Sequence, residues 1–258
     1  MSPTPEHVIA SINDTSLRPE EYLRHLGSDG ARLRAVATDL TAPVPSCPEW
    51  TVSDLVAHVA AVYSHKTAAM TSGKHPADGQ WATAPPDGLD VLSWYDTELA
   101  SIERELSARA SGEPSWTWWP PDQSVGFWQR RMAQETLVHR WDAELAAGST
   151  TALDPELATD GVDEILGWLG WEFDEPAPGA AGQTVLVRTP GLAWTVTLDP
   201  MSAVVAAASG AAEPGGAVIE GSPEQLLLHL WGRAPQDAVT QTGDQTALRL
   251  FAERLAQV

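Results

Sequence analysis

Residues 127–145 read FWQRRMAQETLVHRWDAEL and contain neither glycine nor proline, so we predict that they form a helix. One apolar stripe of this helix is expected to pack against neighbouring helices, and it consists of Leu137, Val138, Trp141 and Leu145. A second stripe lies about a third of a turn away and consists of Trp128, Met132, Glu135, His139 and Asp142. The helix therefore has two faces that favour an interior position.

The second stripe changes from apolar residues to a carboxylate, an imidazole and another carboxylate. Solvated helix faces are seldom bordered by tryptophan and methionine, so these polar groups are expected to be buried and to need a partner such as a metal ion. Glu135 and His139 are one turn apart and could bind the same ion. Asp142 could then accept the second ring N–H of His139.

A third ligand is available on another predicted helix, over residues 51–70, with Thr51 as its N-cap and Asp54 three residues later. In a helix bundle, inward residues of facing helices form metal sites, so His58 could complete the set. Two histidines and one carboxylate leave coordination positions open, as in catalytic zinc sites. Two alternatives stay open: His65 could replace Glu135 as a ligand, or these side chains could be ordinary packed polar groups.

The overall composition limits the possible partners. A chain of 258 residues with 43% apolar residues is expected to be globular, and its net charge of −20 argues against a nucleic-acid or anionic-membrane partner. No apolar run is long enough for a transmembrane helix, and the start MSPTPEHVIA does not resemble a signal peptide. We therefore expect a cytoplasmic protein. Its twelve tryptophans indicate either core packing or an aromatic-walled pocket.

The pattern along the chain predicts three parts: a leader at residues 1–19, a four-helix bundle at 20–150 and a smaller α+β domain at 151–258. The predicted helices of the bundle span residues 19–40, 51–70, 88–110 and 127–145. The second domain is expected to contain a helix at 154–171, a hairpin at 183–189 and 192–199, weaker strands at 202–208 and 217–220, and helices at 225–233 and 244–256.

Three segments of the chain carry a resemblance to a known family. They are PSCPEWTVSDLVAH at residues 45–58, the helix at 127–145, and GSPEQLLLHLWGR at 221–233. Together they resemble the signatures of the mycothiol-dependent maleylpyruvate isomerase family, within the DinB-like metal-binding bundles. The likeness covers the chain from about residue 23 and is specific for the family, though not for one reaction within it.

The resemblance implies that a DinB-like bundle holds a divalent metal, usually zinc, through His58, Glu135 and His139. It also implies a sterol-carrier-like C-terminal domain that covers the site and supplies a catalytic arginine, for which Arg233 is the best match by position. An arginine that caps the end of its own helix is the alternative interpretation of Arg233.

The resemblance further implies mycothiol as cosubstrate, with its thiol deprotonated at the metal. Trp128 and Arg131 are expected to contact the bound molecules. Arg131, Arg130 or Arg233 could pair with a substrate carboxylate. An ion pair with Glu135 is the alternative for Arg131.

We accordingly predict a mycothiol-dependent isomerase or thiol S-transferase that acts on a small electrophilic acid, as a monomer or small homo-oligomer. In an isomerase the thiolate would add to a cis double bond, allow rotation and leave, whereas in a transferase it would stay attached. The alternative function is a non-catalytic small-molecule-binding protein with a tryptophan-walled cavity and a structural or absent metal.

Overall fold

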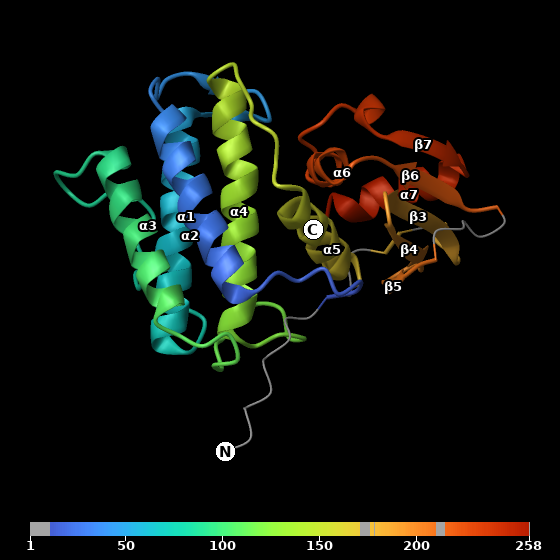
Figure 1. The fold of residues 1–258 in the computed structure, drawn as a ribbon, viewed down its shortest axis with the longest axis horizontal. Coiled ribbons are helices and arrows are strands. Elements are labelled where there is room, and N and C mark those ends of the chain that lie inside the picture. The colour runs from blue at the N-terminus through green and yellow to red at the C-terminus, as the bar shows by residue number, and fades with distance from the viewer. Residues whose placement is uncertain (1–10, 171–175, 178, 210–214, 258) are drawn as a thin grey trace. The chain divides into compact units, whose positions relative to one another are not determined.

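The computed structural model describes residues 11–170, 176–177, 179–209 and 215–257, and within them the chain forms seven α-helices and a mixed β-sheet (Figure 1). Its contacts divide the described residues into two compact units. Unit 1 runs from residue 16 to 151, and unit 2 comprises residues 11–15 together with the chain from residue 152 onward. The predicted number of helices is confirmed, whereas the assignment of independent domains stays a prediction.

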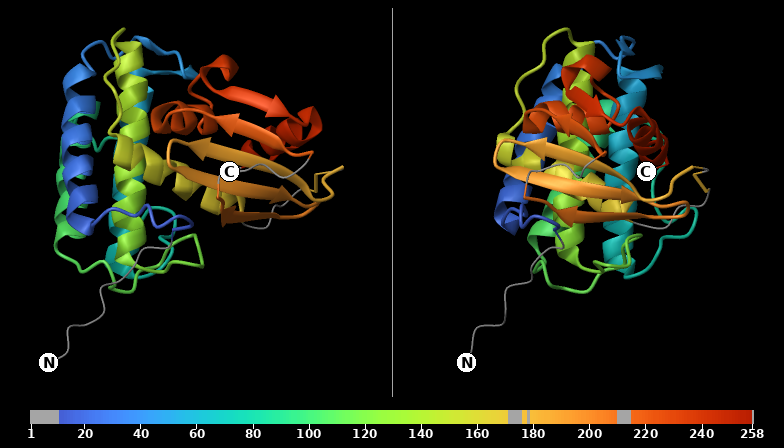
Figure 2. Two further views of the ribbon diagram at one scale, coloured as in Figure 1. Left: turned by 45° about the vertical axis from the view of Figure 1, so that its right-hand side comes forward. Right: turned by 90° about the vertical axis from the view of Figure 1, so that its right-hand side faces the viewer.

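Unit 1 consists of four long helices that run alongside one another (Figures 1 and 2). They are α1 (Pro19–Val36), α2 (Val52–Ser72), α3 (Val91–Ser107) and α4 (Val125–Ala146). Helix α1 packs against α3 and α4, and α2 packs against the same two helices. The core between them contains many fully buried large side chains, among them Leu26, Leu33, Leu55, Tyr63, Trp94, Tyr95, Ile102 and Trp128.

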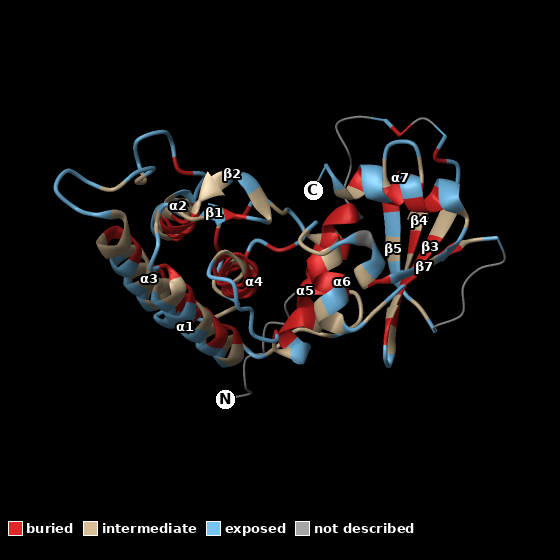
Figure 3. Ribbon diagram, turned by 90° about the horizontal axis from the view of Figure 1, so that it is seen from above, coloured by how far each residue is buried: buried red, intermediate tan, exposed pale blue. Residues whose placement is uncertain are grey.

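Helix α4 is the most deeply buried helix of this unit (Figure 3). Every residue from Val125 to Glu144 is buried except Glu135, which agrees with the two inward faces predicted from its sequence. Its charged residues have partners: Arg140 donates to Glu144 at 2.8 Å, and Glu144 also accepts from Arg32 at 2.6 Å. Such pairing offsets the large cost of removing isolated charges from water.

Local capping explains where the helices differ from the predicted bounds. Helix α3 begins at Val91 rather than residue 88 because the Asp90 side chain accepts the N–H groups of Leu92 and Ser93. Helix α1 ends at Val36 and not at Leu40, ahead of the proline-containing segment at residues 43–48. The N-cap predicted at Thr51 is confirmed, since its Oγ1 accepts the N–H of Asp54 at 3.3 Å.

A short antiparallel hairpin connects α1 to α2 and packs on α4 and α2. Its strands are β1 (Pro43–Val44) and β2 (Cys47–Thr51). Glu49 and Trp50 lie in β2, and α2 begins at Val52, directly after the predicted N-cap Thr51. The hairpin carries Ser46 and Trp50 to the side of α4 that bears Asp142 and His139.

Unit 2 combines a five-stranded sheet with three helices. The strands of the sheet are β3 (Gln183–Thr189), β4 (Leu192–Leu198), β5 (Ala203–Ala207), β6 (Ala217–Glu220) and β7 (Thr240–Gly243). The helices are α5 (Pro155–Leu169), α6 (Pro223–Leu230) and α7 (Gln245–Leu255), with a 3₁₀ turn at Gln236–Ala238. The strand order is β5-β4-β3-β6-β7, and the sheet is mixed because β3 and β6 are parallel while the other neighbours are antiparallel. The predicted hairpin is confirmed, with Gly191 at φ +88° in its turn.

Part of the predicted leader belongs to unit 2. The buried Asp163 carboxylate of α5 accepts the backbone N–H groups of Ile12 and Asn13, at 2.9 and 3.0 Å, and the Ser11 hydroxyl at 2.9 Å. It also accepts the indole N–H of Trp194 at 2.7 Å. Residues 11–15 are therefore anchored, while residues 1–10 of the predicted leader lie outside the described residues.

None of the helices in the described parts of the chain has the length and apolar character needed to span a membrane.

Candidate metal centre

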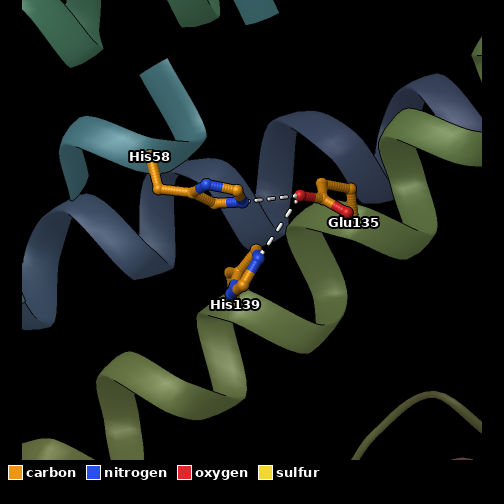
Figure 4. Close-up of side chains that lie close together, drawn as sticks. All are labelled: His58, Glu135 and His139. Carbon is orange, nitrogen blue, oxygen red and sulfur yellow. Dashed lines mark hydrogen bonds and ion pairs between the residues drawn. The ribbon is translucent and has the colours of Figure 1, made fainter. Parts of the chain in front are cut away.

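Three side chains from two helices of unit 1 converge at one point (Figure 4). His58 comes from α2, and Glu135 and His139 come from successive turns of α4. Glu135 Oε1 lies 3.3 Å from His58 Nε2 and 3.3 Å from His139 Nε2. One ligand atom from each residue lies within 4.8 Å of the other two. The structure thus brings together the three residues predicted as metal ligands.

These distances fit a divalent metal with nitrogen and oxygen ligands. Ligands about 2.0–2.2 Å from a tetrahedral zinc ion are separated from one another by about 3.3–3.5 Å. Both Glu135–histidine distances, at 3.3 Å, fall at this value, whereas a strong charge-assisted hydrogen bond would be shorter. Two imidazoles and one carboxylate are also a donor set that zinc accepts, with at least one position left for another ligand.

The orientation of His139 is fixed by a buried carboxylate behind it. Its Nδ1 lies 2.9 Å from Oδ2 of Asp142, a residue with no exposed surface. The other oxygen of Asp142 accepts the hydroxyl of Ser46 at 2.5 Å. Because Nδ1 bonds to Asp142, Nε2 is the ring nitrogen that faces Glu135 and His58. Asp142 occupies the place predicted for it, and Ser46 is a partner that the sequence analysis did not identify.

The electrostatics of the site show how strongly it favours a cation. Burial acts to raise the pKa of Glu135, but His139, His58 and Arg131 outweigh it and hold that pKa well below its usual range. Burial likewise acts to lower the pKa of His139, and the carboxylates of Glu135 and Asp142 overcome it and raise the pKa to about 9. When no metal is bound, protonated His139 therefore supplies a positive charge at this cluster.

Arg131 forms the ion pair that the sequence analysis gave as its alternative role. Its Nη2 donates to Oε2 of Glu135 at 3.2 Å, and its side chain is buried. Arg131 thus contacts the carboxylate oxygen that faces away from the two histidines, which leaves Oε1 as the oxygen between them. A contact between Arg131 and a bound substrate stays a prediction.

An aromatic wall covers one side of the two histidines. The ring of Trp50 lies 4.8 Å from that of His58 and 6.2 Å from that of His139, measured between ring centroids. Trp50 and His58 also line an open pocket of about 510 Å³, together with Trp81 and residues of α2. An aromatic-walled pocket was one of the two interpretations of the many tryptophans, the other being core packing. Trp50 was not singled out, because its position depends on how the hairpin packs.

His65, the rival ligand, lies elsewhere on α2. Among the residues that the structure describes, the group able to hold a metal contains His58, Glu135 and His139, and His65 is outside it. Its ring packs against His75 at 5.8 Å and Trp81 at 4.9 Å, and its Nδ1 lies 3.2 Å from Nζ of Lys66. The geometry therefore favours Glu135 over His65 as the third member of the set.

Trp128 and Arg233, the other predicted site residues, make contacts within their own units. Trp128 is completely buried in the core of unit 1, and its indole N–H donates to the carbonyl of Trp116 at 2.9 Å. Arg233 follows α6 in unit 2, and its Nη1 donates to the carbonyl of Trp231, the C-cap residue, at 2.8 Å. This is the capping interaction given as its alternative, while the proposed roles in binding and catalysis remain predictions.

Comparison with known proteins adds three findings. The family model described as "Mycothiol maleylpyruvate isomerase N-terminal domain" matches residues 23–144. Two uncharacterized proteins, from two strains of Mycobacterium tuberculosis, are each 29% identical to this chain over 147 residues, which is 54% of this chain and 72% of each relative.

The third finding comes from solved structures. Crystal structures of the mycothiol-dependent maleylpyruvate isomerase and of its histidine-to-alanine mutant superpose with TM-scores of 0.59 and 0.61, at 16% and 15% identity. Each match covers 92% of this chain and 97% of the other chain. At such identities the likeness shows a shared fold.

Proposed function

We propose that this chain, whose residues 23–144 match the N-terminal domain of the mycothiol maleylpyruvate isomerase family, is a mycothiol-dependent metalloenzyme acting on a small electrophilic acid. Isomerisation of a cis double bond and transfer of the thiol are the two reactions that fit this proposal. A monomeric or small homo-oligomeric protein in the cytoplasm is part of the same proposal.

One observation carries the proposal: His58, Glu135 and His139 place their ligand atoms within 4.8 Å of one another. Divalent zinc suits this donor set, and these three side chains would hold it. The buried Asp142 supports the arrangement, since histidines that bind metals commonly donate their other N–H to a carboxylate.

Each residue of the cluster has a distinct task in this proposal. Asp142 holds His139 in the tautomer that presents Nε2, and Arg131 neutralises the outer oxygen of Glu135. Trp50 shields the two imidazoles from water on one side. A divalent metal, when bound, supplies Lewis acidity that favours the thiolate form of a thiol beside it. The pocket next to His58 gives room for the substrate.

The architecture is part of the same proposal. The side-by-side packing of α1–α4 supports a DinB-like four-helix bundle, in which ligands arise from facing helices. The five-stranded sheet with α6 and α7 supports the comparison of unit 2 with sterol-carrier modules. Arg233 is retained as the proposed catalytic arginine of that unit.

Metal analysis of the purified full chain tests the site. We expect about one zinc or other divalent ion per chain in the wild type and a large loss of metal in His58→Ala and His139→Ala. The matched control is His75→Ala, since His75 is an exposed histidine of the same unit outside the cluster. Full metal occupancy in both cluster variants would refute the site.

Incubation with mycothiol and maleylpyruvate tests the reaction. Turnover to fumarylpyruvate that disappears in His139→Ala supports an isomerase. A thiol adduct of the electrophile supports a transferase instead. If the metal-loaded protein consumes neither thiol nor electrophile from a panel of small unsaturated acids and epoxides, the proposed activity is wrong.

A further inference from the structure

Lys66 of α2 is a cation close to the candidate metal centre. In the described part of the chain, its ammonium group bonds to a histidine and not to a carboxylate. Its Nζ lies 3.2 Å from His65 Nδ1 and 5.2 Å from the centroid of the Trp128 ring. Among the described residues, His65 Nδ1 is the side-chain atom within hydrogen-bond distance of this ammonium, and the carboxylate that acts on it electrostatically is that of Glu135. An ammonium group has three N–H donors, so its one hydrogen bond to His65 leaves donors for another group.

The surroundings of Lys66 favour the arrival of an anion. Partial burial is the main cause that lowers the pKa of Lys66 to about 8; the Glu135 carboxylate opposes this shift, and the Arg131 guanidinium adds to it. The ammonium therefore lies within electrostatic reach of the metal-site carboxylate and of a second cation. A partly dehydrated cation with no ionic partner is stabilised when a carboxylate binds to it.

The position of Lys66 along α2 relates it to the centre. It follows His58 by eight residues, which corresponds to about 12 Å along the helix axis. Its ammonium lies over the ring of Trp128, which precedes Glu135 by seven residues on the same stripe of α4, so the head group faces the helix that carries two of the three proposed ligands. Trp81 lies between the pocket at His58 and the neighbour of Lys66: it lines that pocket, and its ring centroid is 4.9 Å from that of His65.

We infer that Lys66 is a specificity-determining residue that binds a carboxylate of the electrophile. The inference rests on the proposed function and deepens it by assigning the residue that recognises the negative charge of the electrophile. Trp128 supports the lysine head group through its ring, since cations over an indole face are attracted to it. Arg131 differs from Lys66 in this respect, because it already donates to the Glu135 carboxylate.

Binding of maleate and its neutral diamide to the metal-loaded full chain tests this inference. Lys66→Met keeps an apolar stem against Trp128 and removes the charge. We expect it to weaken the binding of maleate about 10- to 100-fold, as for loss of a charged hydrogen bond, and to change diamide binding less than about threefold. Lys66→Arg is expected to restore most of the affinity for maleate. Tryptophan fluorescence or calorimetry gives both dissociation constants.

The chain provides a matched control in Lys74, its only other lysine, which is exposed. Lys74→Met makes the same change in net charge and should leave the binding of maleate unchanged. The inference is overturned if Lys66→Met weakens the binding of maleate and of the diamide equally, or if Lys74→Met weakens the binding of maleate as much as Lys66→Met does. It is also overturned if the metal-loaded wild type does not bind maleate. Lys66→Gln serves the same comparison if Lys66→Met does not fold.

The same samples separate this inference from the proposed function. Metal content tests the metal centre and should not change in Lys66→Met, whereas thiol consumption should fall for electrophiles that carry a carboxylate. If the wild type binds metal and consumes thiol, but Lys66→Met changes the binding of maleate and of the diamide equally, the role of Lys66 is refuted and the proposed function is not. A protein without metal refutes the function on which that role rests.

Discussion

Replacing Asp142 by asparagine is the most direct test of how the centre is organised. The change keeps the size of the side chain but removes the charge that accepts the Nδ1–H of His139 at 2.9 Å. Asp142 has no exposed surface, so water cannot take over this role without a rearrangement. Loss of such a second-layer partner typically weakens metal binding about 10- to 100-fold, or about 1.4–2.7 kcal/mol.

Competition with a chromogenic chelator at fixed pH gives the metal affinity of wild type and Asp142→Asn. Thermal unfolding of the same samples shows whether the fold is retained. The control is Ser46→Ala, because Ser46 bonds the other oxygen of Asp142 at 2.5 Å and does not contact His139. We expect a smaller loss of affinity in this variant. Unchanged metal affinity in a folded Asp142→Asn protein would refute the role given to Asp142, and so would an equal loss in Ser46→Ala.

Three further predictions concern stability and pH. Gly30→Ala should lower the free energy of unfolding by about 1 kcal/mol in urea titrations, because the new Cβ would lie 2.9 and 3.0 Å from the two methyl carbons of Leu99 and the cost of moving them exceeds the gain in helix propensity; an unchanged midpoint would contradict this packing. In the metal-free protein, His139 has a pKa of about 9, above its ordinary value, so its contribution to stability is present below about pH 6.5 and is lost as the pH rises to 9. Urea titrations across this range, with His139→Gln as the comparison, should show that loss in the wild type only, and metal affinity should rise over the same range as protons leave. Asp163→Ala should cost about 3 kcal/mol or more, since it leaves the buried indole N–H of Trp194 without its acceptor and releases residues 11–13; fast hydrogen exchange of those amides in the variant, and slow exchange in the wild type, is the expected measurement.

Much of the fold follows from local sequence signals. Helix α4 was predictable because residues 127–145 contain no helix breaker and carry two inward stripes, and the observed helix includes them all. The end of α1 was not predictable from the sequence, because the apolar spacing continues to Leu40 while the helix already ends before Ala37. Strand β7 was missed as well: its sequence, TQTG, has no apolar alternation, and it exists because it pairs with β6 at the edge of the sheet.

The candidate site divides in the same way. His58, Glu135 and His139 could be proposed from helical spacing and from the family resemblance, and the structure brings the three side chains together. The family model that matches residues 23–144 agrees with that resemblance. Ser46 and Trp50 could not be proposed, since their contacts with Asp142 and the two imidazoles depend on the packing of the hairpin on α4. The family match also favours an enzyme over the alternative of a non-catalytic binding protein.

The anchoring of residues 11–15 by Asp163 makes unit 2 discontinuous in sequence. During synthesis, these residues leave the ribosome before residues 16–151 of unit 1, yet Asp163 and Trp194 follow some 150 and 180 positions later. The hydrogen bonds around Asp163 can therefore be completed only after Trp194 of the 258-residue chain has been made. A gene cut after residue 151 would encode a C-terminal fragment without this segment, and the fragment would gain stability from a synthetic peptide that contains residues 11–15.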